Sequence, residues 1–273
     1  MKKLGRVFIG VVYAILYAPL LVMAVFSFNS AKSTTTFSGF SLRWYVNLFY
    51  DRSMRGILLN TLLISACAAV LATVLGVIAA YGIYKMRSKR LKSAVNTVTN
   101  IPLINPDIIT GVSLMLLFTF FGTWFLHNSA ILGFWTLLIA HITFNLPYVI
   151  LNVLPRLYGS DVSLYEAALD LGCTKTKAFW RVVFPGIVPG IVSGFIMAFT
   201  LSLDDFIISY YTNGHCNILA TSLYTAVKKP LSPEYYALYS LIFLTILLLL
   251  TAVNVIEIRS DRKNSTVKKK IGD

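Results

Sequence analysis

Long uncharged runs of apolar residues dominate the chain. A bilayer-spanning helix needs about 20 consecutive apolar residues, and six regions meet that length. One of them, 93–125, is too long for a single straight crossing and is broken by Pro102 and Pro106. The pattern therefore predicts six membrane spans, at 7–28, 57–84, 93–125, 131–154, 185–211 and 235–256.

The composition supports this interpretation. The 273 residues are 57% hydrophobic and 13% charged, with a mean hydropathy of +0.73, whereas soluble domains are about a quarter charged. The first run is longer than the ~7–15 apolar residues of a secretory signal, so we expect it to be retained. The predicted fold class is all-α, a polytopic membrane protein with one transmembrane domain over 1–260 and a basic tail over 261–273.

Basic residues alternate in density between the connections of the spans. Of the 24 Lys and Arg residues, 18 fall in the connections that share one side of the membrane with both termini. The positive-inside rule places this side in the cytoplasm. The net charge of +13 is then explained by orientation and by contact with anionic membrane lipid, and we expect no nucleic-acid partner.

The cysteines indicate no disulfide and no metal site. Cys67, Cys173 and Cys216 fall in a span, a cytoplasmic loop and an external loop of the predicted topology, so no two can pair. We expect neither a metal nor a cofactor in this chain.

The longest predicted cytoplasmic loop, 155–184, has the pattern of two short helices. Ser163 is expected to cap the first, with Glu166 three residues later as in a capping box. Gly172 can end that helix by adopting a positive φ. Thr174 is expected to cap a second helix that stops before Pro185. One face of the first helix is apolar, through Leu164, Ala167, Ala168 and Leu171.

This loop resembles the EAA loop of binding-protein-dependent ABC permeases. EAA at 166–168 is followed by three residues, the glycine, nine residues and VxFP at 182–185, where the usual pattern ends in IxLP. The resemblance implies a MetI-like permease fold and an elbow that docks on an ATPase subunit. It assigns this coupling role to Glu166, Ala167, Ala168, Gly172 and Pro185. The chain has no GxxxxGK[ST] phosphate-binding motif, so ATP hydrolysis is expected on another polypeptide and this subunit is not expected to be an enzyme.

Three acidic residues fall within predicted spans, where charge is costly and usually functional. Asp107 lies ~22 Å of helix beyond Lys92, and Asp204 lies ~28 Å beyond Pro185, which places them in the middle or outer part of the membrane. With Asp205 they form a predicted substrate path for a cation, since an interrupted helix with polar residues is a common transporter site.

Structural roles for these acids stay open at this point. Asp107 can cap the helix after Pro106, and the Asp204–Asp205 pair can mark an interfacial helix end. Adjacent residues point about 100° apart on a helix, so one of the two is expected to face the path. Ser202 and Tyr210 can add hydrogen bonds and Trp44 a cation–π face. His141 is interpreted as an interhelical hydrogen-bonding residue rather than a ligand.

The segment Ser202–Phe206, SLDDF, resembles the corresponding segment of polyamine-importer permeases, the PotC type, and the likeness extends over nearly the whole chain. It implies spermidine or putrescine as the solute. It also implies a partner permease of the PotB type, an ATPase dimer of the PotA type and an external polyamine-binding protein of the PotD type. The protein is then expected in the bacterial cytoplasmic membrane.

Other functions compete with this one. An ABC permease for another organic cation or a metal complex shares all of these features. An ion-coupled carrier or cation channel could use intramembrane aspartates but leaves the EAA loop without a purpose. An intramembrane enzyme is disfavoured, because HExxH and GxSxG are missing and adjacent aspartates on a helix make poor catalytic partners.

Overall fold

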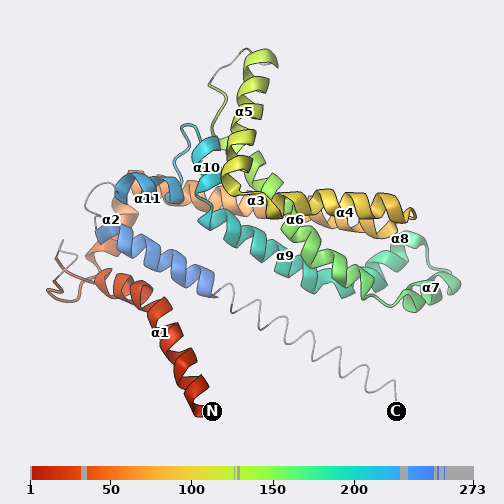
Figure 1. The fold of residues 1–273 in the computed structure, drawn as a ribbon, viewed down its shortest axis with the longest axis horizontal. Coiled ribbons are helices and arrows are strands. Elements are labelled where there is room, and N and C mark those ends of the chain that lie inside the picture. The colour runs from red at the N-terminus through yellow and green to blue at the C-terminus, as the bar shows by residue number, and fades with distance from the viewer. Residues whose placement is uncertain are drawn as a thin grey trace. The chain divides into compact units, whose positions relative to one another are not determined.

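The computed structural model describes residues 2–31, 36–125, 127, 130–227, 233–248, 251 and 255. The described residues divide into two compact units, one drawn from 2–59 and 222–248 and the other from 60–221. The helices, shown in Figure 1, are α1 (Lys2–Phe26), α2 (Arg43–Tyr50), α3 (Arg52–Lys85), α4 (Lys89–Ile104), α5 (Asp107–Phe125), α6 (Phe134–Tyr158), α7 (Val162–Asp170), α8 (Lys175–Ala178), the π-helical turn η1 (Phe179–Val183), α9 (Phe184–Asp204), α10 (Ile207–Thr212) and α11 (Leu219–Val227).

Within the described residues, five helical segments are long and apolar enough to cross a membrane. These segments are Gly5–Phe26, Arg52–Lys85, Asp107–Phe125, Phe134–Tyr158 and Lys175–Asp204. A shorter apolar helix, Pro233–Leu248, covers part of the predicted sixth span. Most of 249–256 and the whole tail 261–273 lie outside the described residues. The all-helical membrane fold class is confirmed.

Two of the predicted spans are interrupted. In the third, α4 ends at Ile104 and α5 begins at Asp107, with Asn105 extended at φ −73° and ψ 132°. Pro106 causes this break, because a proline disfavours helical backbone in the residue before it; Pro102 lies inside α4. In the fifth, α9 ends at Asp204 and α10 starts at Ile207. The fifth predicted span, 185–211, therefore contains two helices rather than one.

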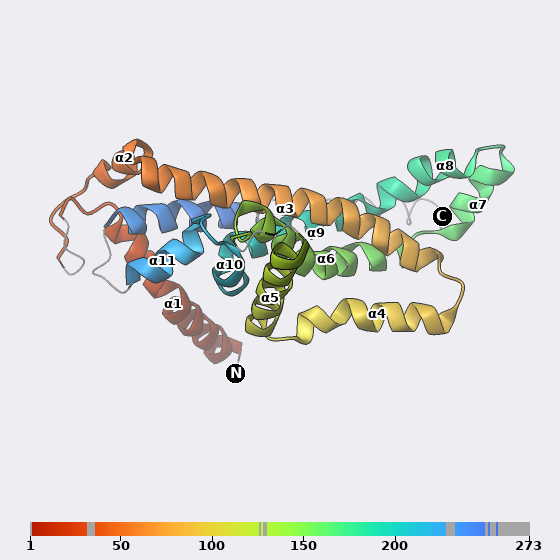
Figure 2. The same cartoon turned by 90° about the horizontal axis from the view of Figure 1, so that it is seen from above.

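The second unit is built on the pair α6 and α9, which lie side by side in Figures 1 and 2. Two glycines on α9, spaced as GxxxG, allow a close crossing. A Cβ on Gly190 would lie 2.6 Å from the Asn152 carbonyl oxygen, and one on Gly194 would lie 3.3 Å from the Val149 Cα. The buried cluster around this crossing includes Ala72, Val149, Val153, Leu157, Ile187 and Ala198.

Helix α10 packs against the first part of α5. A Cβ on Gly111 of α5 would lie 3.3 Å from the Cα of Ile208 in α10. The hydroxyl of Thr136, at the start of α6, donates to the Thr212 carbonyl at 2.9 Å. These contacts bring the break before α5 close to the break after α9.

In the first unit, α2 is fixed by its buried aromatic residue. Trp44 is 1% exposed, and its indole N–H donates to the carbonyl of Asn29. The Phe28 ring stacks on Phe40 with centroids 5.2 Å apart, and the Ser27 hydroxyl lies 2.7 Å from the Tyr45 hydroxyl. Helix α2 therefore closes on the segment that follows α1.

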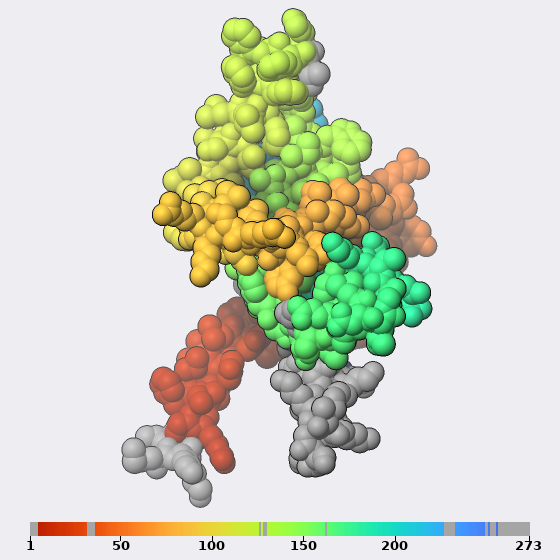
Figure 3. Space-filling view, turned by 90° about the vertical axis from the view of Figure 1, so that its right-hand side faces the viewer, coloured from red at the N-terminus to blue at the C-terminus, as the bar shows by residue number. Residues whose placement is uncertain are grey.

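The elbow, residues 161–183, comprises α7, α8 and η1 at the opposite end of α9 from α10 (Figure 1). Figure 3 faces this end and shows the elbow exposed, in green. Two expectations about it are wrong. Asp161, rather than Ser163, caps α7, because its carboxylate accepts from the Ser163 N–H and hydroxyl at 2.9 and 2.6 Å. The second helix also does not stop before Pro185, since the helical segment runs on to Asp204.

The π-helical turn explains this continuity. The Phe184 N–H bonds to the Phe179 carbonyl, five residues back, which shifts the hydrogen-bond ladder just before the proline. Pro185 then stands at the beginning of α9, where a missing N–H costs little. Thr174 does cap α8 as expected, accepting from the Lys177 N–H at 3.4 Å.

Candidate functional site

A pocket of about 390 Å³ lies where the two helix breaks meet. It contains all three acidic residues singled out from the sequence. Its lining residues come from α5, α6, α9 and α10 and are Asp107, Phe144, Tyr148, Leu201, Asp204, Asp205, Phe206, Ile207 and Ile208. The tertiary fold thus joins residues that are about a hundred positions apart in the chain.

Each carboxylate is placed by the end of a helix. Asp107 is the first residue of α5 and Asp204 the last residue of α9. The chain leaves the helix after Asp205, whose ψ is 116° and whose N–H still bonds to the Leu201 carbonyl at 3.0 Å. Both adjacent acids line the pocket at this helix end, whereas the sequence led us to expect only one of them to face it.

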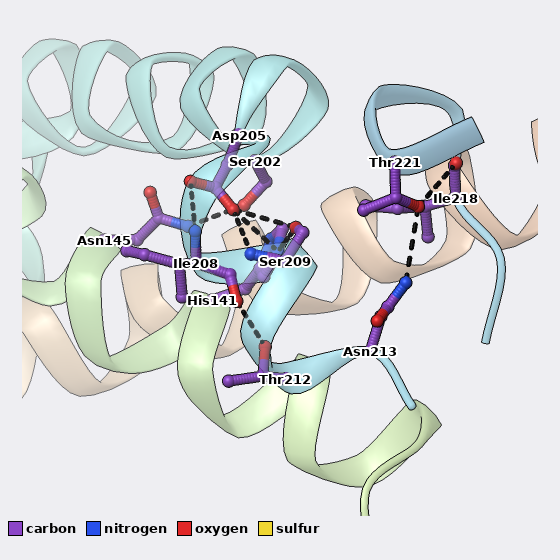
Figure 4. Close-up of polar contacts among 10 residues, drawn as sticks. All are labelled: His141, Asn145, Ser202, Asp205, Ile208, Ser209, Thr212, Asn213, Ile218 and Thr221. Carbon is purple, nitrogen blue, oxygen red and sulfur yellow. Dashed lines mark hydrogen bonds and ion pairs between the residues drawn. The ribbon is translucent and has the colours of Figure 1, made fainter. Parts of the chain in front are cut away.

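Asp205 is held from behind by hydrogen bonds, as Figure 4 shows. Its Oδ2 accepts from the backbone N–H and the hydroxyl of Ser209, both at 2.8 Å. Its Oδ1 accepts from the Ile208 N–H at 3.4 Å. Asp205 therefore caps the start of α10, and its side chain is only 9% exposed.

The other two carboxylates are more available. Asp107 and Asp204 are both exposed. Within the described part of the chain neither makes an ion pair, and no Lys or Arg lines the pocket. Asp107 stands one position inside the helix rather than at its cap, so the capping role weighed from sequence does not account for it. Three acidic side chains in a pocket whose described lining has no Lys or Arg favour a cationic ligand.

The remaining sequence-predicted residues are not among those that line the pocket. Ser202 is buried and its hydroxyl accepts from Asn145 Nδ2 at 2.7 Å. Tyr210 is half exposed on α10, with its ring beside Phe206 and Tyr211. Trp44 is buried in the other unit. None of the three is a lining residue.

His141 behaves as expected from the sequence. Its Nε2 lies 2.9 Å from the Ser209 hydroxyl, which links α6 to α10. Two rings of α6 that no sequence pattern indicated, Phe144 and Tyr148, also line the pocket. Their four-residue spacing places them on one helix face, but the chain has 18 Phe and 15 Tyr residues. Without the position of the pocket, this spacing does not distinguish them.

A second pocket, of about 220 Å³, lies under the elbow. The Lys85 ammonium, at the end of α3, is surrounded there by the rings of Tyr81, Tyr84 and Tyr165, at 5.7, 5.8 and 5.2 Å from their centroids. Tyr165 belongs to α7. These cation–π contacts therefore fasten the elbow to α3, each with about 0.5–1 kcal/mol.

Gly172 ends α7 as predicted. Its φ is +83°, its N–H bonds to the Leu169 carbonyl at 2.9 Å, and the Cys173 N–H bonds to the Ala168 carbonyl at 3.0 Å. This is a Schellman motif, which requires a left-handed residue at that position. The rest of the apolar face of α7 points outward, with Leu164 59% and Leu171 86% exposed.

Comparison with known proteins decides the family. The family model described as the binding-protein-dependent transport system inner membrane component matches residues 72–263. These residues include both helix breaks, the pocket and the elbow. The chain belongs to this family. It is a permease subunit of an ABC importer rather than an enzyme, and a multi-pass protein of the cytoplasmic membrane.

Curated relatives match most of the chain. The spermidine/putrescine transport system permease protein PotC of Haemophilus influenzae is 36% identical over 96% of this chain and 98% of its own length. PotC of Escherichia coli K12 is 35% identical over 91% and 90%. The putrescine transport system permease protein PotI of Escherichia coli K12 is 39% identical over 84% and 82%.

Solved structures share the fold. A bacterial ABC transporter that imports alginate aligns with a TM-score of 0.69 at 17% identity, over 96% of this chain and 95% of that one. The MetNI methionine transporter aligns with a TM-score of 0.58 at 17% identity, over 76% and 97%. The MetI-like permease fold expected from the EAA loop is therefore confirmed.

Proposed function

We propose that this permease imports polyamines, spermidine or putrescine, through the pocket between α5, α6, α9 and α10. The observation that carries the proposal is the convergence of Asp107, Asp204 and Asp205 on one pocket, whose described lining includes no Lys or Arg. Relatives that are 35–39% identical are spermidine/putrescine or putrescine permeases, which supports the same solute class.

The chemistry of the pocket suits a polyamine. Primary and secondary amines are protonated at neutral pH, and several charges on one flexible chain can be matched by several carboxylates. The methylene groups between them need apolar contacts, which the pocket offers through Leu201, Ile207 and Ile208. The rings of Phe144 and Tyr148 add faces that attract ammonium groups.

The same proposal includes the partner subunits and the coupling of transport to ATP hydrolysis. The distribution of basic residues supports a topology with the elbow and both termini in the cytoplasm. The exposed leucines of α7, with Glu166, Ala167, Ala168, Gly172 and Pro185, then dock on an ATPase dimer of the PotA type. A PotB-type permease completes the path, and a PotD-type binding protein delivers the solute. ATP-driven closure, transmitted along α9, switches the pocket between outward and inward access.

The test is uptake of labelled spermidine and putrescine in cells that lack their own importers, with the whole transporter co-expressed. Asp107→Asn and Asp204→Asn are the informative variants, because neither side chain makes a described hydrogen bond that the change would break. Loss of one charged contact is worth about tenfold in uptake at subsaturating solute. Asp51→Asn is the matched control, since its carboxylate accepts from the Ser53 and Met54 N–H groups and does not line the pocket.

The outcomes separate the alternatives. Reduced uptake in both pocket variants, with normal protein level and a normal control, supports the acidic path. Uptake of both polyamines that is unchanged in the two variants and in their combination would overturn it. If the intact transporter takes up no polyamine but does accumulate another organic cation or a metal complex, the solute assignment fails while the permease assignment stands.

A further inference from the structure

Buried polar groups stand directly behind Asp205, on the side away from the pocket. His141 of α6 is 0% exposed. Its Nε2 lies 2.9 Å from the Ser209 hydroxyl and 3.7 Å from Asp205 Oδ2. Figure 4 shows that the three side chains come from α6, α10 and the break between α9 and α10. The packing of α6 against α9 and α10 does not by itself require a histidine at this position.

The hydrogen-bond directions follow from counting protons. The Ser209 hydroxyl has a single hydrogen, which it donates to Asp205 Oδ2. Its oxygen must therefore accept from His141, so the ring carries its proton on Nε2. The chain of donors runs from His141 through Ser209 to Asp205. Within the described structure, Nδ1 of the same ring has no partner, so only the Nε2 side of the imidazole is used.

This chain of donors fixes one oxygen of the carboxylate. Oδ2 receives two short bonds from Ser209, whereas Oδ1 receives only the longer bond from Ile208. Oδ1 thus keeps most of its capacity to accept, and its carboxylate lines the pocket. A hydroxyl that is itself polarised by a donor bonds more strongly to an anion, so His141 restricts the orientation of Asp205.

We propose that His141 is a positioning residue for solute recognition: through Ser209 it holds Asp205 with Oδ1 presented to an ammonium group of the solute. The inference rests on the proposed function, because it assumes that the pocket receives a cation. His141 itself does not line the pocket, and it acts only through the serine. Its contribution should therefore vanish when the carboxylate it orients is removed.

The test compares uptake by the whole transporter carrying His141→Leu, His141→Gln or Ser209→Ala. The leucine variant removes the donor and should lower uptake at subsaturating polyamine about tenfold. The glutamine variant can return an N–H near the position of Nε2 and should recover most of this loss. Thr143→Val, which removes an exposed hydroxyl on the same helix, is the matched control and should behave as wild type.

A double-mutant cycle distinguishes positioning from simple packing. If His141 acts through Asp205, His141→Leu costs nothing further in an Asp205→Asn background, or in Ser209→Ala if the first background is inactive. Additive losses, or failure of His141→Gln to recover uptake while thermal stability is normal, would overturn the inference. Unchanged uptake in Asp107→Asn and Asp204→Asn would instead indicate that the proposed function had failed.

Discussion

The crossing of α6 and α9 gives a sharp prediction about two glycines one helical turn apart. Gly190 faces α6, where an added Cβ would lie 2.6 Å from the Asn152 carbonyl oxygen and 2.9 Å from the Arg156 Cγ. Gly186 has nothing within 4 Å of its added Cβ. Replacing each by alanine therefore makes the same chemical change in two different surroundings on one helix.

The two substitutions should change the free energy of unfolding in opposite directions. In open space, alanine is favoured over glycine in a helix by about 1 kcal/mol, so Gly186→Ala should be neutral or slightly stabilising. For Gly190→Ala, ordinary contact begins at 3.4 Å, so α9 must retreat from a backbone atom by about 0.8 Å. Such overpacking costs about 1–3 kcal/mol. The two variants should differ by ~2–4 kcal/mol.

The assay is thermal unfolding of the purified transporter, followed by loss of the monodisperse peak on size exclusion. For a chain of this size the difference corresponds to a gap on the order of 5–10 °C between the two variants. Gly190→Ala should also reduce uptake, because α9 joins the elbow to the pocket. Equal melting temperatures for the two variants would refute the close crossing.

Three further predictions concern the elbow and the topology. Gly172 has φ +83° and open space around it, so Gly172→Asn should be tolerated. Gly172→Val should lower stability by about 1–2 kcal/mol and reduce the uptake per ATP hydrolysed. Equal uptake per ATP in both variants would contradict the need for a left-handed residue. Lys85→Met should also lower the uptake per ATP hydrolysed, whereas Lys85→Arg retains the contact with Tyr165. A normal value for Lys85→Met would show that the cation–π contacts of Lys85 are not needed for coupling. A membrane-impermeant maleimide should label Cys216 in intact spheroplasts and label Cys173 only after lysis; the reverse pattern would invert the topology.

Some features of the elbow were predictable from its local sequence and others were not. A glycine that must end a helix is recognisable from sequence, and Gly172 adopts the positive φ expected of it. The start of the same helix was placed two residues late, because Asp161 and Ser163 are both good caps and sequence does not rank them. Pro185 was taken as a stop, yet the preceding π-helical turn accommodates it, and such a register shift has no local sequence signature.

The pocket was predictable only in part. Charge within an apolar run marked Asp107, Asp204 and Asp205, because an acid in a span is costly wherever it lies. Ser202 and Trp44 were chosen by nearness in sequence or by residue type, and both are buried in other contacts. The rings of Phe144 and Tyr148 were missed, since the part of α6 that carries them has no Asp, Glu, Lys or Arg and no break to distinguish that face.

The sequence by itself determined that this protein is helical, lies in the membrane and belongs with ABC permeases, because hydropathy, basic-residue asymmetry and the EAA pattern are properties of contiguous residues. Only the tertiary structure decided that α9 breaks at Asp205, that this break meets the start of α5, and that His141 stands behind the carboxylate. These features depend on how closely helices approach. That distance is set by side chains that meet across the fold, such as Gly111 against Ile208 and Gly190 against Asn152.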